Sequence, residues 1–355
     1  MVTIWILAGI VLAGGMAALL FGIHRGRRQG QLAAAVRIQS PNGIDEGRFV
    51  KLGGIEQWIR IRGEDRRNPV ILVMHGGPAT SYMAFAQWFR PWERHFTVVQ
   101  WDRRGVGKTF GRNGRSGSGE MTLERIIADG GELCEFLRRH LQKKKILLLG
   151  HSMGSMIGVS MAARHPDLLY AYVGTEQLID MPRNESVSYR IILDKVRKLG
   201  DLKTTKALER LGPPPYAKPR DWGTKQYAAE AADTAYGALS HQAKDLVRYS
   251  PEYSVKDLFD LVNGALFCIS KLYGQWMRFD AHRLGAQFKT PVFIIQGDED
   301  VMTPTQLARE WVEGIEAPRK AFIPIEGGCH LVMVTAADAY LAALLQHVRP
   351  LAEET

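Results

Sequence analysis

Apolar residues along this chain fall into short continuous runs that alternate with longer stretches of helical periodicity. Such runs are typical of strands that are buried on both faces of a parallel sheet. The stretches 123–141 and 155–164 carry apolar residues at helical spacing. The alternation predicts an α/β fold built on a doubly wound, mostly parallel sheet with right-handed crossovers. The predicted buried strands are Val70–Met74, Phe96–Trp101, Ile146–Leu149, Leu169–Val173, Val292–Ile295 and Ala321–Ile323.

Two further features complete the predicted architecture. Phe49–Leu52 and Gln57–Ile61 lie on either side of Gly53-Gly54 and predict a β-hairpin before the first buried strand. After Leu169–Val173, which is the sixth strand when the hairpin is counted, the alternation of strands and helices stops. Helical periodicity interrupted by Pro213-Pro214-Pro215 then predicts an inserted helical lid. The predicted division is a core of residues 46–178 and 289–355, with the lid at residues 179–288.

The N-terminus carries an uncharged, apolar stretch from Val2 to Ile23. As a helix it would rise roughly 30 Å, enough to cross a hydrocarbon core. A cleaved signal peptide and a buried helix are the alternatives, but the basic residues follow this stretch rather than precede it. We therefore expect a transmembrane anchor at residues 1–23 and a tether at residues 24–45. The positive-inside rule then predicts a single-pass membrane protein with its main domain in the cytoplasm.

The composition of the chain excludes several classes of site but does not indicate a function. The chain has 355 residues and a formal charge of +9, but no basic stripe interleaved with aromatic residues and no zinc-finger or RNP signature. Nucleic acid is therefore not an expected partner. Cys134, Cys268 and Cys329 are too scattered for a disulfide framework or a metal site, so we expect free buried thiols. No metal or other cofactor is expected, and the sequence leaves the oligomeric state open.

One phosphate-binding motif can be rejected. Gly105-Val106-Gly107-Lys108-Thr109 resembles the end of a Walker A loop. The full motif requires a glycine five positions before Gly107, and Asp102 occupies that position.

The strongest chemical motif is Gly150-His151-Ser152-Met153-Gly154. It fits the G-x-S-x-G nucleophile elbow of the α/β-hydrolase fold, and it lies between a predicted strand and a predicted helix, as that elbow requires. An ordinary strand–helix turn with a buried serine is the alternative. We expect Ser152 to be a catalytic nucleophile, and His151 to be a packing residue beside it.

A serine nucleophile needs a histidine base and a carboxylate that orients it, in the chain order Ser, acid, His in this fold. His330 follows the last predicted strand on a glycine-rich loop and is the expected base. Asp298, Glu299 and Asp300 compete for the acid. In α/β-hydrolases the acid usually lies three residues after the glycine that ends the strand, which selects Asp300, with Asp298 as the alternative.

The transition state also needs two backbone N–H groups directed at the developing oxyanion. One is expected from Met153, the residue after the nucleophile. The second is expected from the loop His75-Gly76-Gly77-Pro78, with Gly77 as the first choice and Gly76 as the second. A plain glycine–proline turn is the alternative for this loop.

Together these residues resemble the proline-iminopeptidase-like α/β-hydrolases. The resemblance rests on the His75–Pro78 loop, the stretch Gln100–Gly107 and the Ser152 elbow, and it covers roughly residues 45–178 and 286–350. It implies an aminopeptidase that releases N-terminal residues, proline above all, from short peptides. It also implies the Ser152, Asp300 and His330 triad without a metal.

The chain departs from that family at several positions. It has His-Gly-Gly-Pro-Ala where a final glycine is usual, and Arg103 replaces a usual glutamine. The lid lacks the Trp-Glu pair that commonly binds the substrate's amino group. Glu176 and Glu185 are the candidate substitutes, unless they are solvated or helix-capping residues. Two other functions stay open: a carboxylesterase or lipid-acyl hydrolase at a membrane, and a non-catalytic membrane-tethered binding protein.

Overall fold

The fold is organised around one twisted sheet. The computed structural model describes residues 2–353, and for residues 2–11 it describes the backbone helix without the side chains. Within this range the sheet is 8-stranded, in the order β1-β2-β4-β3-β5-β6-β7-β8. β2 pairs antiparallel with β1 and β4, and the remaining neighbours pair parallel. The predicted hairpin and mostly parallel sheet are therefore confirmed. The strands are β1 (Ile44–Leu52), β2 (Ile55–Gly63), β3 (Val70–Met74), β4 (Thr97–Asp102), β5 (Ile146–His151), β6 (Leu169–Thr175), β7 (Val292–Gly297) and β8 (Lys320–Ile325).

The central strands are buried on both faces, which explains their continuous apolar sequence. Every residue of β3 is buried, and its side chains alternate between two hydrophobic clusters. Leu72 belongs to the cluster that α4, α5 and α11 cover, whereas Ile71 and Val73 belong to the cluster covered by η1 (Tyr82–Phe85) and α13. Helices thus lie on both faces of the sheet, as a doubly wound fold requires. The helices are α1 (Val2–Ala35), α2 (Ala86–Phe89), α3 (Gly107–Gly117), α4 (Leu123–His140), α5 (Met153–Arg164), α6 (Met181–Lys198), α7 (Leu202–Leu211), α8 (Pro219–Ala232), α9 (Thr234–Arg248), α10 (Val255–Trp276), α11 (Thr305–Gly314), α12 (Val332–Thr335) and α13 (Ala337–Ala343).

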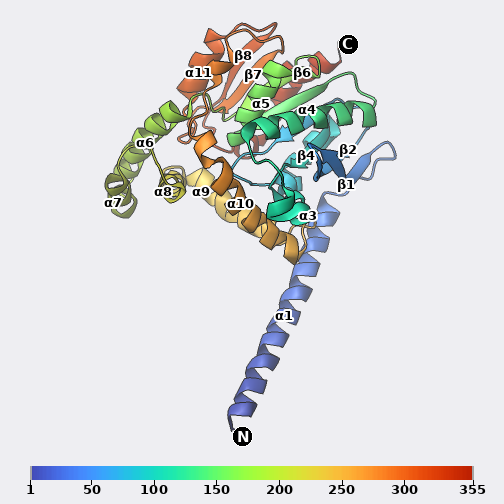
Figure 1. Cartoon of the computed structure of the whole chain (residues 1–355), viewed down its shortest axis with the longest axis vertical. Coiled ribbons are helices and arrows are strands. Elements are labelled where there is room, and N and C mark those ends of the chain that lie inside the picture. The colour runs from blue at the N-terminus through green and yellow to red at the C-terminus, as the bar shows by residue number, and fades with distance from the viewer. Residues whose placement is uncertain (1, 354–355) are drawn as a thin grey trace.

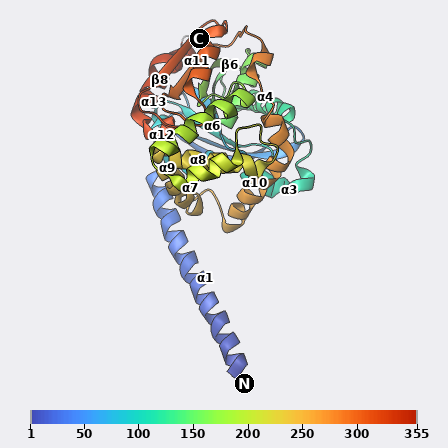
Figure 2. The same cartoon turned by 90° about the vertical axis from the view of Figure 1, so that its left-hand side faces the viewer.

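Helices α6 to α10 fill the chain between β6 and β7. They lie together on one side of the body, where Figure 2 shows α6 and α8 in front of the sheet. The first of them begins at Asp180, whose side chain accepts a hydrogen bond from the Arg183 N–H, and α10 begins with a capping box at Ser254. Part of this segment has its own small core, which includes Ile192 of α6 and Leu208 of α7.

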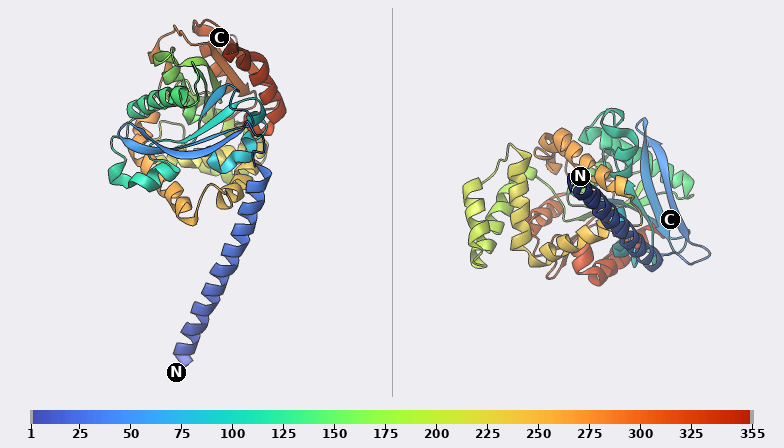
Figure 3. Two further views of the ribbon diagram at one scale, coloured as in Figure 1. Left: turned by 90° about the vertical axis from the view of Figure 1, so that its right-hand side faces the viewer. Right: turned by 90° about the horizontal axis from the view of Figure 1, so that it is seen from below.

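The N-terminal helix α1 projects away from the body (Figures 1 and 3). It extends through residues 24–35, part of the segment predicted as a tether, because this stretch is Ala-rich and is fixed at its start. Gln29 donates to the Ser250 carbonyl at 2.7 Å, and the guanidinium of Arg25 donates to the carbonyls of Arg248 and Tyr253.

The predicted transmembrane anchor at residues 1–23 is not supported by the part of the chain that the structure describes. No helix within that part is sufficiently long and apolar to cross a membrane. Residue 1 and the side chains of residues 2–11, which belong to the predicted anchor, lie outside the described residues.

A buried ion pair joins the first hairpin to the body. Arg104 and Asp129 are 1% and 0% exposed, with the Arg104 Nε 2.8 Å from the Asp129 Oδ2. Arg104 also donates to the Gly53 carbonyl at 2.9 Å, and Gln57 donates to Asp129 at 2.8 Å. Removing one partner of such a pair leaves a buried charge without full compensation.

Replacing Arg104 with methionine should therefore lower the free energy of unfolding by about 3–5 kcal/mol. Urea unfolding followed by circular dichroism measures this change. The matched control is Arg112→Met, which breaks an exposed pair with Glu56 (side chains 55% and 47% exposed). That control should cost less than about 1 kcal/mol, and equal losses for both variants would contradict this account of the buried pair.

Candidate active site

Ser152 lies at a strained turn between β5 and α5. Its φ is 51° and its ψ is −125°, an unfavourable conformation for a residue with a side chain. Close backbone packing holds the turn. A Cβ on Gly154 would lie 2.2 Å from the Met74 carbonyl oxygen, and one on Gly150 would lie 2.8 Å from the Ser155 Cα. Only glycine fits at these two positions, as expected for a nucleophile elbow.

The loop after β3 passes directly over this turn. A Cβ on Gly76 would lie 2.8 Å from the His151 Nδ1 and 3.0 Å from the Ser152 Cβ. Gly77 has a φ of 60° and borders the same cavity as Met153, so the two predicted oxyanion donors flank Ser152. Arg103 holds the loop from behind, because its guanidinium donates to the His75 carbonyl at 2.8 Å and to the Gly77 carbonyl at 3.2 Å.

Ser152, His330 and Asp300 form a continuous hydrogen-bonded chain. The His330 Nε2 lies 3.0 Å from the Ser152 Oγ, and the His330 Nδ1 lies 2.9 Å from the Asp300 Oδ2. All three residues are buried, with exposed fractions of 8%, 4% and 4% in the order Ser152, His330, Asp300. The loops that carry His330 and Asp300 pack backbone to backbone, since a Cβ on Gly297 would lie 2.2 Å from the Gly328 oxygen.

Among the three candidate acids, the structure brings only Asp300 to the histidine; Asp298 and Glu299 are exposed. The Asp300 carboxylate also accepts backbone hydrogen bonds from Met302 at 2.7 Å and Thr303 at 3.0 Å. Burial favours the protonated carboxyl, but the charge of His330 and the hydrogen bonds from His330 and Thr303 outweigh it, so the pKa of Asp300 lies below its ordinary value. Asp300 is therefore ionised at neutral pH.

Glu176, predicted as a substrate ligand unless it is a solvated or helix-capping residue, is not solvated, and its Oε1 accepts a hydrogen bond from the backbone N–H of Val332, the first residue of α12. It is 0% exposed, its Oε2 lies 3.0 Å from the His151 Nε2, and it is not among the cavity-lining residues. Burial raises its pKa well above the usual range, with the charge of Asp300 acting in the same direction. Burial also lowers the pKa of His151 to about 3, and the charge of His330 adds to this effect. Burial thus favours the uncharged form of both groups in this contact.

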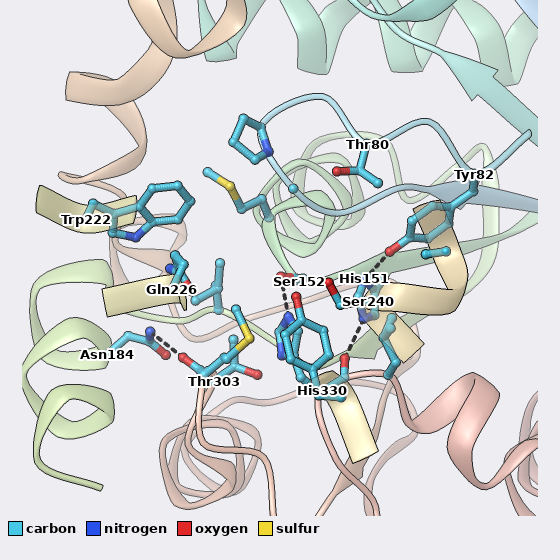
Figure 4. A pocket seen from close by; sticks show the side chains of 18 of the residues that line it. Thr80, Tyr82, His151, Ser152, Asn184, Trp222, Gln226, Ser240, Thr303 and His330 are labelled. Atoms are coloured by element: carbon cyan, nitrogen blue, oxygen red, sulfur yellow. Dashed lines mark hydrogen bonds between the residues drawn. The ribbon is translucent and has the colours of Figure 1, made fainter. Parts of the chain in front are cut away.

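His151 is more than a packing residue. Its Nε2 lies 3.1 Å from the His330 carbonyl oxygen, and its Nδ1 is hydrogen-bonded to the Tyr82 hydroxyl at 2.5 Å. Figure 4 shows these contacts beside Ser152. His151 therefore ties the loop of His330 to η1.

A cavity of about 380 Å³ opens beside Ser152 and His330. Its lining is largely apolar, and it contains Glu185, the second predicted substrate ligand. Glu185 is 4% exposed and lies inside α6, whose N-cap is Asp180, so it is neither solvated nor a cap. Lys225, which is 0% exposed, lies behind it with its Nζ 2.8 Å from the Glu185 Oε2.

Sequence reasoning missed the positions of Arg103, Lys225 and Tyr236. The Tyr236 ring packs edge-on against His330, with ring centroids 5.5 Å apart. Arg103 had a usable signal, because it stands in the Gln100–Gly107 motif at the position where the resembled family has another residue. Lys225 and Tyr236 lie in the helical segment and carry no motif.

The cysteines also follow the sequence prediction. Cys134, Cys268 and Cys329 are free and buried. Cys329, next to His330, is 3% exposed and contacts the Thr335 hydroxyl.

Comparison with known proteins agrees with this geometry. Residues 69–337 match the model of the alpha/beta hydrolase fold family. The chain belongs to this family. It is 27% identical to the probable aminopeptidase YbaC of Bacillus subtilis (strain 168) over 311 residues, which is 84% of this chain and 95% of that protein. It is 22% identical to the proline iminopeptidase of Lactobacillus helveticus over 322 residues, covering 85% of this chain and 96% of the relative.

Solved structures show the same fold. A proline iminopeptidase-related protein from Thermus thermophilus superimposes with a TM-score of 0.55 at 18% identity, covering 88% of this chain and 100% of that one. The predicted resemblance to proline-iminopeptidase-like α/β-hydrolases is therefore confirmed.

The raised pKa of Glu176 has a consequence for stability. Folded Glu176 keeps a proton that the unfolded chain releases above the ordinary glutamate pKa of about 4.3. Stability is therefore lost as the pH rises from that value toward the folded pKa, by at most about 1.4 kcal/mol per pH unit. Glutamine cannot ionise, so Glu176→Gln should gain stability relative to the parent chain as the pH rises above the ordinary glutamate pKa.

Urea unfolding at several pH values measures this difference. The control is Glu313→Gln at an exposed position, for which the difference from the parent should stay flat. A flat difference for Glu176→Gln as well would contradict the assignment of a buried, protonated Glu176.

Proposed function

We propose that this hydrolase cleaves an ester or amide bond through an acyl-enzyme formed on Ser152. The observation that carries the proposal is the Ser152–His330–Asp300 hydrogen-bonded chain at the edge of a cavity. A serine hydroxyl is a weak nucleophile by itself, and this arrangement supplies the base and the group that orients it.

In the proposed reaction Ser152 attacks the substrate carbonyl while His330 takes the hydroxyl proton. Ionised Asp300 accepts from the His330 Nδ1–H and stabilises the imidazolium that forms. The backbone N–H groups of Met153 and Gly77 stabilise the oxyanion, where one donor is typically worth on the order of 100-fold in turnover. His330 then protonates the leaving group, and water, activated in the same way, releases the acid.

Ser152→Ala should abolish labelling by a fluorophosphonate probe and lower turnover of an activated ester on the order of a million-fold. In-gel fluorescence of the full chain measures the labelling. The matched control is Ser160→Ala, a buried serine on α5 whose hydroxyl donates to the Met156 carbonyl at 2.7 Å. Failure of the parent chain to label, or equal labelling of Ser152→Ala, would support a non-catalytic binding protein instead.

Two substrate classes are candidates for this site. The names of the relatives support a short peptide with a free amino terminus. The cavity supports a neutral acyl group. Among the cavity-lining residues in the described part of the chain, Glu185 is the only acid, and Lys225 compensates its charge at 2.8 Å. Because a compensated carboxylate attracts a cation weakly, the geometry favours neutral esters or amides over substrates with an ammonium group.

The two substrate classes can be separated by comparing p-nitroanilides that differ only in whether their amino group is free. We expect N-acetyl-alanine p-nitroanilide to have a kcat/KM at least equal to that of alanine p-nitroanilide, and p-nitrophenyl esters to be hydrolysed as well. A kcat/KM at least about tenfold higher for the free-amine anilide than for its N-acetylated form, with alanine or with proline, would contradict the neutral-substrate proposal. That result would support an aminopeptidase. Lys225→Met, which leaves Glu185 without its cation, should shift the preference toward the free amine.

A further inference from the structure

Helix α8 contributes two side chains to the cavity wall that each carry an enclosed, unpaired polar atom. The Trp222 Nε1 is a hydrogen-bond donor and the Gln226 Oε1 an acceptor, and neither has a hydrogen-bond partner among the described residues. The two residues are four positions apart, so their side chains share one face of the helix. Figure 4 shows them beside Asn184, across the cavity from Ser152 and His330.

The position of this pair is fixed by the residue between them. Lys225 is buried and is not among the cavity-lining residues, and its Nζ lies 2.8 Å from the Glu185 Oε2 and 3.2 Å from the Ser188 Oγ. Glu185 and Ser188 both belong to α6. The buried ion pair therefore fastens α8 to α6, and it holds Trp222 and Gln226 at a set distance from Ser152.

Buried polar atoms are almost always paired, and an unpaired one is unfavourable. Here the two side chains line a cavity that also contains the reacting serine, so a bound substrate that turns them slightly into the cavity is the molecule that would pair them. The matching group must accept a hydrogen bond from the indole N–H and donate one to the amide oxygen. A carboxamide does both, and it pairs with the Gln226 side chain in either orientation of that amide.

We propose that Trp222 and Gln226 form a subsite for a neutral carboxamide group of the substrate. This inference rests on the proposed function and narrows its substrate class. The charge of the surroundings agrees, since the Glu185–Lys225 pair beside the subsite has no net charge. An ammonium or carboxylate at the same position would lose its hydration without gaining a counter-ion.

Matched esters test the subsite. One pair is p-nitrophenyl 4-carbamoylbutanoate and p-nitrophenyl 5-methylhexanoate, which have nearly the same shape but differ in the terminal amide. A second pair, butanoate esters of 5-hydroxypentanamide and 5-methylhexan-1-ol, places the same difference in the alcohol portion. The parent chain should prefer the amide member of at least one pair by about tenfold in kcat/KM.

Variants of α8 then assign that preference. Gln226→Leu and Trp222→Phe should each reduce the amide-to-isostere ratio of kcat/KM about tenfold, while both variants keep fluorophosphonate labelling of Ser152. Tyr227→Leu, at a side chain that is 66% exposed on the same helix, is the control and should leave the ratio unchanged.

The outcomes separate the two claims. Loss of fluorophosphonate labelling in the parent chain would contradict the proposed function itself. The subsite alone would be overturned if the parent chain is labelled and hydrolyses the apolar esters but prefers the amide in neither pair. It would also be overturned if the Gln226 and Trp222 variants leave the amide-to-isostere ratio unchanged.

Discussion

The rest of the site depends on the strained backbone at Ser152. A φ of 51° is held only because neighbouring backbone passes within van der Waals distance on several sides, from the end of β3, from α5 and from the loop over the elbow. Each approach requires a glycine, at Gly76, Gly150 and Gly154. The strained turn directs the serine hydroxyl out of the sheet toward His330. The glycines of the motif permit the close packing, and the close packing holds the turn that the chemistry requires.

Two buried carboxyl groups near this turn have pKa values shifted in opposite directions, because burial dominates at Glu176 whereas the charge of His330 and hydrogen bonds outweigh burial at Asp300. Asp300 receives N–H donors from Met302 and Thr303 together with the imidazole of His330, which keep it ionised. Glu176 is also buried but faces His151, and the backbone hydrogen bonds from Val332, at 3.3 Å, and from Gly297 do not offset the effect of its burial. Asp300 can therefore stabilise a charged histidine, whereas the surroundings of Glu176 favour its protonated form.

Local patterns predicted most of the fold and the residues of the candidate site. Continuous apolar runs located the strands, and the elbow motif with the glycine loops located Ser152, His330 and both oxyanion candidates, because each of these depends on residues adjacent in sequence. Asp300 was chosen among three acids by spacing alone, and only the loop geometry separates it from its exposed neighbours. What sequence could not give depends on tertiary packing: Glu185 resembles an acidic ligand until the helical segment folds and places Lys225 behind it, forty positions along the chain. Glu176 directly follows β6, and only the packing around the carboxyl ends of the strands shows that it is buried.

The central claim is that Ser152 carries the acyl group during turnover. Reacting the full chain with a fluorophosphonate, followed by proteolysis and mass spectrometry of the peptides, locates the covalent adduct directly. We predict one adduct per chain, on the peptide containing Gly150-His151-Ser152-Met153-Gly154, with fragmentation assigning the added mass to Ser152. An adduct on any other residue, or an unmodified Ser152 in a chain that still hydrolyses esters, would contradict it.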